Sequence, residues 1–90
     1  MADPGAAMRE ATRSGPATGS RWRHYKGSTY TVTAVVIRES DLSPLVVYGP
    51  DNSEVRWARP LCEWSQLVMG KDGRPVPRYR SLEPNPPQRG

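Results

Sequence analysis

A single long β-type run, residues 29–38, constrains the fold more than any other part of the 90-residue chain. Val, Ile, Thr and Tyr dominate this run, and these residue types favour a pleated strand. One of its alternating faces is wholly apolar and consists of Tyr30, Val32, Ala34 and Val36. The other face begins with threonines and ends with Val35 and Ile37. This change predicts a strand that bends and buries first one face and then both, as at the corner of a barrel.

Shorter β-type segments surround this run at nearly regular intervals. Residues 21–26 precede it, and Gly27-Ser28 is expected to form a two-residue hairpin turn between the two strands. Later strands are predicted at residues 45–48, 54–59, 67–69 and 74–81. Polar segments rich in Gly, Pro, Asp, Asn and Ser separate them.

Two further patterns refine the predicted architecture. Leu61 and Trp64 have the spacing of one helical or 3₁₀ turn. Pro75 and Pro77 alternate, which is tolerated only in an edge strand because proline has no N–H to donate. We therefore expect an all-β fold, a small SH3-like barrel or roll of five to six short antiparallel strands with one short helical turn.

The folded unit is expected to span residues 21–82. Residues 1–20 are rich in Ala, Gly, Ser, Thr and Pro without apolar periodicity, which predicts a disordered leader. Residues 83–90 include three prolines and are expected to form a disordered tail. A unit of this size is near the lower limit for a lone hydrophobic core. This small size favours a homodimer and leaves little room for a deep enzyme cleft.

The charge predicts an anionic partner. The formal net charge is +4, and residues 21–82 account for all of it, with ten Lys and Arg against six Asp and Glu. The partner could be a nucleotide-like small molecule, a nucleic acid or an acidic protein, and the alternative is an ordinary solvated surface. Cys62 is the only cysteine and no metal-site spacing occurs, so neither a disulfide nor a metal or cofactor is expected. No apolar run is long enough to span a membrane and no signal-peptide pattern begins the chain, so a cytoplasmic location is expected.

A series of short motifs carries a resemblance to a known family. The motifs are Arg23-His24-Tyr25-Lys26-Gly27, Leu45-Val46-Val47-Tyr48, Trp57-Ala58-Arg59-Pro60-Leu61, Asp72-Gly73 and Val76-Pro77-Arg78-Tyr79. In this order they resemble the small bacterial and phage domains grouped as domain of unknown function 1653. The family usually has Val in place of Ala58, and an aromatic, Gly-containing loop where residues 49–56 are polar here. The resemblance implies a compact β domain and carries no established activity with it.

Aromatic and basic residues are better candidates for binding than for catalysis. His24 is the only histidine, but no Gly-x-Ser-x-Gly, phosphate loop or metal spacing accompanies it, so an enzyme is not expected. The candidate ligand-binding residues are Trp22, His24, Lys26, Tyr48, Trp57, Arg59 and Arg78. Flat rings stack on nucleobases, while Arg and Lys neutralise phosphate oxygens. His24 and Lys26 are expected to share one strand face.

Structural roles are the alternative for several of these residues. A chain with no Phe must fill its core with Tyr and Trp, so Tyr48 and Trp57 could be core residues, and Arg59 could pair with Glu63 or Asp72. The preferred function is a non-catalytic module that holds an anionic, nucleotide-like ligand at the barrel mouth. By analogy with other small phage proteins, it could sequester a nucleotide signal in a phage setting. The alternatives are a nucleic-acid-binding accessory domain and a protein-interaction adaptor.

Overall fold

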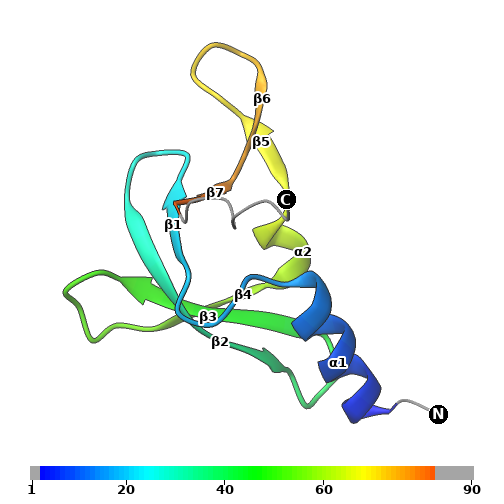
Figure 1. The fold of residues 1–90 in the computed structure, drawn as a ribbon. Helices are drawn as coiled ribbons and strands as arrows, with labels where there is room; N and C mark the ends of the chain where they lie inside the picture. The colour runs from blue at the N-terminus through cyan, green and yellow to red at the C-terminus, as the bar shows by residue number, and fades with distance from the viewer. Residues whose placement is uncertain (1–2, 83–90) are drawn as a thin grey trace, which may run out of the picture.

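The computed structural model describes residues 3–82, which are mostly β (Figure 1). The elements are α1 (Pro4–Ser14), β1 (Arg21–His24), β2 (Thr29–Ile37), β3 (Pro44–Pro50), β4 (Trp57–Pro60), α2 (Leu61–Trp64), β5 (Leu67–Met69), β6 (Pro75–Pro77) and β7 (Tyr79–Ser81). The tail predicted at residues 83–90 lies outside the described residues. No helix in the described part of the chain is both long and apolar enough to cross a bilayer.

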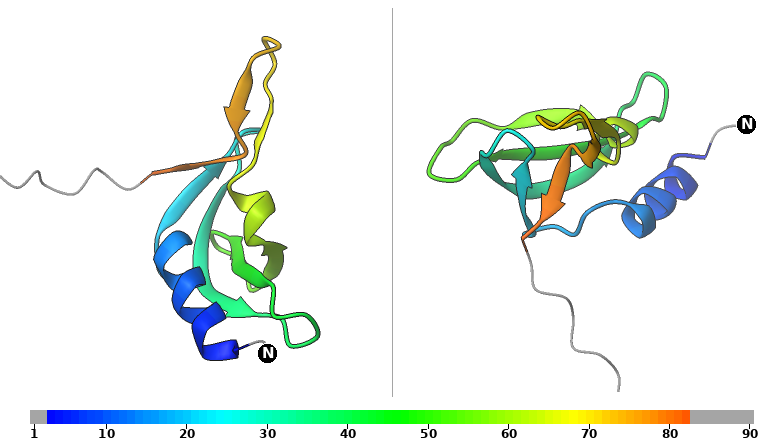
Figure 2. Two further views of the ribbon diagram at one scale, coloured as in Figure 1. Left: turned by 90° about the vertical axis from the view of Figure 1, so that its right-hand side faces the viewer. Right: turned by 90° about the horizontal axis from the view of Figure 1, so that it is seen from above.

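Five strands form one antiparallel sheet in the order β4-β3-β2-β1-β7, and β5 and β6 form a separate hairpin. The sheet is curved, and the hairpin projects from it (Figure 2). Within the described residues β4 and β7 do not pair, so the sheet is not closed into a barrel. The mostly-β, antiparallel prediction is therefore confirmed, whereas barrel closure is not.

The last predicted strand, residues 74–81, is divided between the two sheets at Arg78. The Arg78 N–H donates to the Gln66 carbonyl at 3.0 Å, and the Arg78 carbonyl accepts from the Tyr25 N–H at 2.9 Å. These bonds redirect the chain from the hairpin to the edge of the main sheet. The described residues consequently contain seven strands, where five to six were predicted.

The bend predicted in the long strand is present. The β2–β3 register shifts between Val32 and Ala34, so Thr33 is the extra residue of a β-bulge that bends the strand. The β1–β2 turn lies earlier than predicted: the Gly27 N–H donates to the His24 carbonyl at 2.7 Å, and Gly27 has φ +112°. Because β1 ends at His24, Lys26 lies in this turn, and the expectation that it shares a strand face with His24 is wrong.

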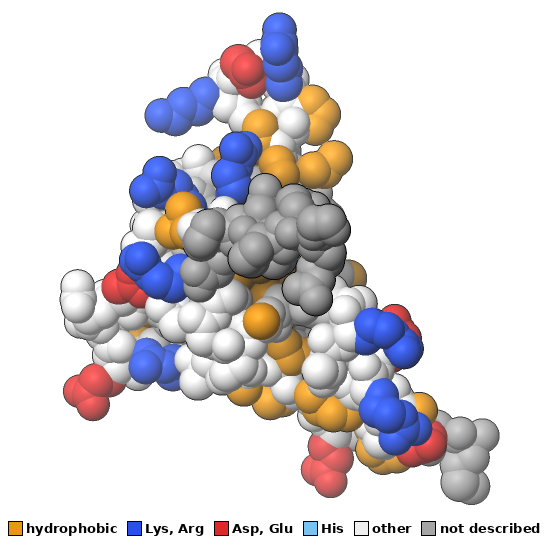
Figure 3. Space-filling view, in the orientation of Figure 1, with side chains coloured by type: hydrophobic (Ala, Val, Ile, Leu, Met, Phe, Trp, Pro, Cys, Tyr) orange, Lys and Arg blue, Asp and Glu red, His pale blue; other side chains and the backbone are white. Residues whose placement is uncertain are grey.

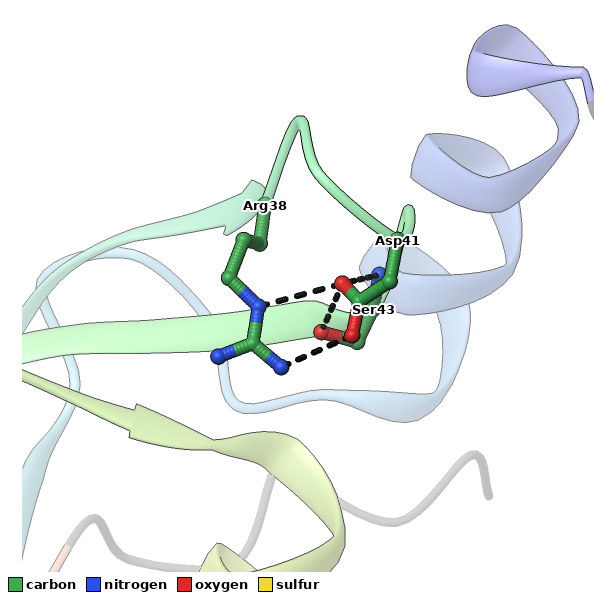
Figure 4. Close-up of polar contacts among 3 residues, drawn as sticks. All are labelled: Arg38, Asp41 and Ser43. Carbon is green, nitrogen blue, oxygen red and sulfur yellow. Dashed lines mark hydrogen bonds and ion pairs between the residues drawn. The ribbon is translucent and has the colours of Figure 1, made fainter.

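A polar network holds the β2–β3 turn (Figure 4). Arg38 donates from Nε and Nη2 to the two carboxylate oxygens of Asp41 at 3.0 and 2.9 Å. The same carboxylate accepts from the Ser43 N–H at 3.1 Å and its hydroxyl at 2.8 Å. The hydrogen bonds from Arg38 and then Ser43 hold the pKa of Asp41 well below its usual range. The turn therefore keeps its ion pair throughout the neutral range.

The core lies between the sheet and α2, and aromatic rings fill much of it. The buried residues of this cluster are Val32, Val46, Tyr48, Leu61, Trp64 and Tyr79. Trp64 stacks on Tyr79 with ring centroids 3.8 Å apart, and Trp22 meets the edge of Trp64 at 5.6 Å. Tyr and Trp thus occupy the volume that Phe fills in other small domains, as the composition predicted. The predicted helical turn is confirmed as α2, which contributes two of these buried residues.

The prediction of a disordered leader at residues 1–20 is wrong for α1. Asp3 caps the helix by accepting the Gly5 N–H at 2.9 Å, and Pro4 occupies the first turn, where its missing N–H costs nothing. The helix lies against β2 (Figure 2), and Ala11 is only 1% exposed. Its one fully buried residue, Ala11, is small, and a search for apolar periodicity detects such a position poorly.

Candidate ligand-binding site

Four of the seven candidate residues line one pocket of about 510 Å³. The pocket lies where the ends of β1 and β7 meet β3, β4 and the first turn of α2. Its lining side chains include His24, Tyr48, Trp57 and Arg59 from the prediction, and Tyr30, Glu63 and Tyr79 in addition. Because β1 and β7 pair with His24 opposite Tyr79, these two side chains lie side by side although they are distant in sequence.

Aromatic rings form most of the pocket wall. Tyr48 is buried and meets Tyr30 at right angles with centroids 5.3 Å apart. Trp57 is the cross-strand neighbour of Tyr48, and its ring centroid lies 5.9 Å from those of both tyrosines. Trp57 is 45% exposed, because β4 is an edge strand of the main sheet. The pocket therefore presents a large, partly exposed ring backed by a rigid aromatic cluster, which suits a planar ligand.

Arg59 provides the positive charge of the pocket. Its Nη1 pairs with Glu63 Oε1 at 3.0 Å, as one sequence interpretation proposed, and its Nε lies 3.4 Å from the Tyr48 hydroxyl. The Tyr79 hydroxyl donates to the Tyr48 hydroxyl at 3.0 Å, and burial followed by this bond raises the pKa of Tyr79. Glu63 and the Tyr48 hydroxyl thus fix the position of the Arg59 guanidinium in the pocket wall.

His24 can act as a neutral hydrogen-bond donor through Nε2. Its Nδ1 accepts the Lys26 N–H at 3.1 Å, so in the neutral ring the proton resides on Nε2. Burial, and then the charges of Arg78, Arg59 and Lys26, lower the pKa of His24. Burial is the largest cause of this shift, and the three neighbouring cations add a positive potential around the ring, which favours an anionic ligand.

The other three candidates lie elsewhere. Trp22 packs into the core, and its Nε1 donates to the Ser20 hydroxyl at 2.8 Å. Lys26 lines a different pocket of about 650 Å³, beside the β5–β6 hairpin. Arg78 donates from Nη2 to Gln66 Oε1 at 3.0 Å and acts on the pocket only through its charge on His24.

Five pocket residues were not predicted as site residues, and three of them, Tyr30, Glu63 and Tyr79, bring a ring or a charge to the pocket. Tyr30 was assigned to the apolar face of its strand, which is correct but does not exclude a place in the pocket wall. Tyr79 reaches the pocket only through the long-range β1–β7 pairing, which no local pattern reports. Glu63 carries a detectable pattern, because an Arg and a Glu four residues apart at a strand-to-helix junction can pair.

A second pocket, of about 570 Å³, lies on the opposite face of β2. Its central group is Asp51, which accepts hydrogen bonds from Arg21 at 2.5 Å, Thr31 at 2.9 Å and Thr29 at 3.2 Å. The hydrogen bond from Arg21 and then that from Thr31 lower the pKa of Asp51. These bonds tie the β3–β4 turn to β1 and β2. In the described residues no group of three or more His, Cys, Asp and Glu side chains could hold a metal ion.

Comparisons with known proteins find a family and a similar structure, and neither description names a ligand. A family model described as "Protein of unknown function (DUF1653)" matches residues 20–81, a segment that excludes α1. The crystal structure of a DUF1653 protein from Bordetella bronchiseptica is similar, with 25% sequence identity and a TM-score of 0.64. The similarity covers 81% of this chain and 95% of that one. No curated protein matches the chain at a significant level.

Proposed function

Because the chain belongs to the DUF1653 family, whose description assigns no activity, we propose a function from its own pocket. The protein is a non-catalytic module that binds an anionic, nucleotide-like small molecule. The observation that carries this proposal is the convergence of the half-exposed Trp57 ring, the Arg59 guanidinium and the His24 Nε2–H donor in one pocket. The ring would stack on a base, while Arg59 and His24 would bind phosphate oxygens.

Binding without catalysis agrees with the chemistry of the lining. Of the described residues that line the pocket, none is Ser, Thr or Cys, so His24 has no aliphatic hydroxyl or thiol nucleophile to activate there. The raised pKa of Tyr79 keeps its hydroxyl protonated at neutral pH. The curved sheet and the α2 turn also support an SH3-like roll whose open end holds the pocket.

Glu63 determines which charge the pocket prefers. Its carboxylate partly compensates Arg59, and a ligand phosphate would take its place as the partner of the guanidinium. Replacing Glu63 by Gln would then strengthen the binding of an anion, because repulsion is removed and Arg59 is released. The same change would weaken the binding of a cationic aromatic-cage ligand. The sign of this one substitution therefore separates the two kinds of ligand.

We expect thermal melting against mono-, di- and cyclic nucleotides and NAD-type compounds to identify a stabilising ligand. At a hundredfold over Kd, a bound ligand adds about 2.7 kcal/mol of stability, a shift on the order of ten degrees for a domain of this size. Arg59→Gln should weaken binding roughly tenfold or more, as expected for a hydrogen bond to a charged group, and Glu63→Gln should strengthen it. Arg74→Gln, on the exposed β5–β6 turn, is the matched control and should leave affinity unchanged.

Three outcomes would contradict the proposal. A shift that Arg59→Gln does not change would place the ligand outside this pocket. A salt-sensitive shift with nucleic-acid polymers alone would indicate a surface that follows a phosphate backbone. No shift with any probe would favour an adaptor that binds another protein.

A further inference from the structure

Two arginines face each other across the outermost strand pair of the main sheet. Arg23 of β1 and Arg80 of β7 are direct partners in the antiparallel register, so their side chains point to the same face. Both residues are exposed. Like charges in directly opposed positions destabilise a sheet, so this pair is not explained by the stability of the fold.

The pair is not neutralised by the described part of the protein. Neither guanidinium has an ion-pair partner within residues 3–82. By contrast, Arg21, Arg38 and Arg59 each pair with a carboxylate. Lys and Arg side chains are prominent over β1, β7 and the β5–β6 hairpin in Figure 3. Within residues 3–82, therefore, no carboxylate pairs with the two positive charges at this edge of the sheet.

A small pocket and an exposed aromatic ring adjoin the pair. Arg23 and Arg80 line a pocket of about 320 Å³ together with Tyr25, Gly27 and Pro77. The Tyr25 ring is 37% exposed, lies 4.6 Å from the His24 ring, and has Lys26 Nζ 5.8 Å from its centroid. The Tyr25 N–H donates to the Arg78 carbonyl at 2.9 Å, and this bond fixes the turn that carries the ring.

We propose that this surface binds single-stranded nucleic acid, with Arg23 and Arg80 on neighbouring phosphates and Tyr25 stacked on a base. Paired cations beside an exposed ring match the two contacts that unpaired strands require, backbone neutralisation and base stacking. An acidic protein segment would pair with the two arginines but would not need the exposed Tyr25 ring. Arg23 alternates with Trp22 and His24 along β1, so the arginine pair lies on the other face of the strand from the pocket of the proposed function, although His24 lines both pockets. The proposal for the arginine pair does not rest on the proposed function.

The test is fluorescence anisotropy of a labelled oligothymidylate of about twelve nucleotides, measured between roughly 50 and 200 mM salt. The double variant Arg23→Gln/Arg80→Gln should lower affinity and reduce the slope of log K against log salt by about 1.4, since each lost contact removes about 0.7. Its melting temperature should be unchanged or higher, because the like-charge pair is removed. Tyr25→Leu should weaken binding roughly fivefold or more, and Tyr25→Phe should restore it.

Arg9→Gln/Arg13→Gln on α1 is the matched control, because it removes the same charge from a distant element. An equal loss of affinity in this control would show that net charge alone drives binding, which overturns the proposal. Equally tight binding of polyglutamate would overturn it in favour of an acidic protein partner. If the wild-type protein does not bind the oligonucleotide at low salt, and the double variant aggregates, the pair serves only to protect the sheet edge. Arg59→Gln should leave oligonucleotide binding intact, which keeps this result separate from the pocket.

Discussion

At the scale of single residues, His24 couples the pocket to pH. The pKa of folded His24 lies below its ordinary value of 6.5, so the unfolded chain binds more protons just below pH 6.5. Stability is therefore complete above this range and falls as the pH is lowered through it. We expect the melting temperature of the wild type to fall more between about pH 7.5 and 5 than that of His24→Asn. Asn is the appropriate substitute because its side-chain oxygen can accept the Lys26 N–H as Nδ1 does.

A bound anionic ligand should oppose the loss of stability that protonation of His24 causes at low pH. An anion beside His24 Nε2 favours the protonated ring, so the nucleotide that stabilises the protein should raise the pKa of His24 in an NMR titration. An equal pH dependence of stability in the wild type and His24→Asn would show that other groups control the transition. In that case the positive potential around His24 would have no consequence for folding.

At the scale of elements, α1 is a helix that packs on the sheet although it lies outside residues 20–81, the segment that matches the family model. Ala11 is buried against β2, whereas Ala6 is exposed on the same helix. Ala11→Lys should destabilise the protein by about 1–3 kcal/mol, because a long charged side chain cannot fit between the helix and the sheet. Ala6→Lys should change stability by less than about 0.5 kcal/mol. Urea unfolding of the two variants measures both values, and equal effects would mean that α1 does not dock.

At the scale of the whole molecule, stability should be uneven. The β5–β6 hairpin stands apart from the main sheet (Figure 1), and its residues Leu67 and Met69 are 61% and 65% exposed. A two-stranded hairpin with so little burial is marginally stable by itself. The hairpin should therefore open more often than the five-stranded sheet.

Hydrogen exchange can measure this difference on two matched amides. The Gly70 N–H closes the hairpin by donating to the Arg74 carbonyl at 2.8 Å, and the Arg38 N–H closes the β2–β3 turn of the main sheet by donating to the Ser43 carbonyl at the same distance. We expect the Gly70 amide to exchange at least about tenfold faster after correction for intrinsic rates. Equal protection would show that the hairpin and the sheet open together as one unit.

Part of the fold and of the pocket could be predicted from local sequence patterns. The alternation of Tyr30, Val32 and the residues after them located β2 and its bend, because alternation depends only on which face of one strand is buried. The absence of Phe predicted an aromatic core of Tyr and Trp, and the Arg59–Glu63 spacing allowed their ion pair. In the same way, basic and aromatic composition identified four residues of the pocket.

The sequence by itself thus located most of the strands and the aromatic core, and it identified four of the residues that line the pocket. Only the tertiary structure decided which residues meet. It placed Trp22 in the core, brought Tyr79 beside His24, and opposed Arg23 to Arg80 through the β1–β7 pairing. It also buried Ala11 and so stabilised a helix where composition predicted disorder. The physical reason is that periodicity records the environment of one element, whereas pairing between distant strands and helix docking depend on surfaces that exist only after folding.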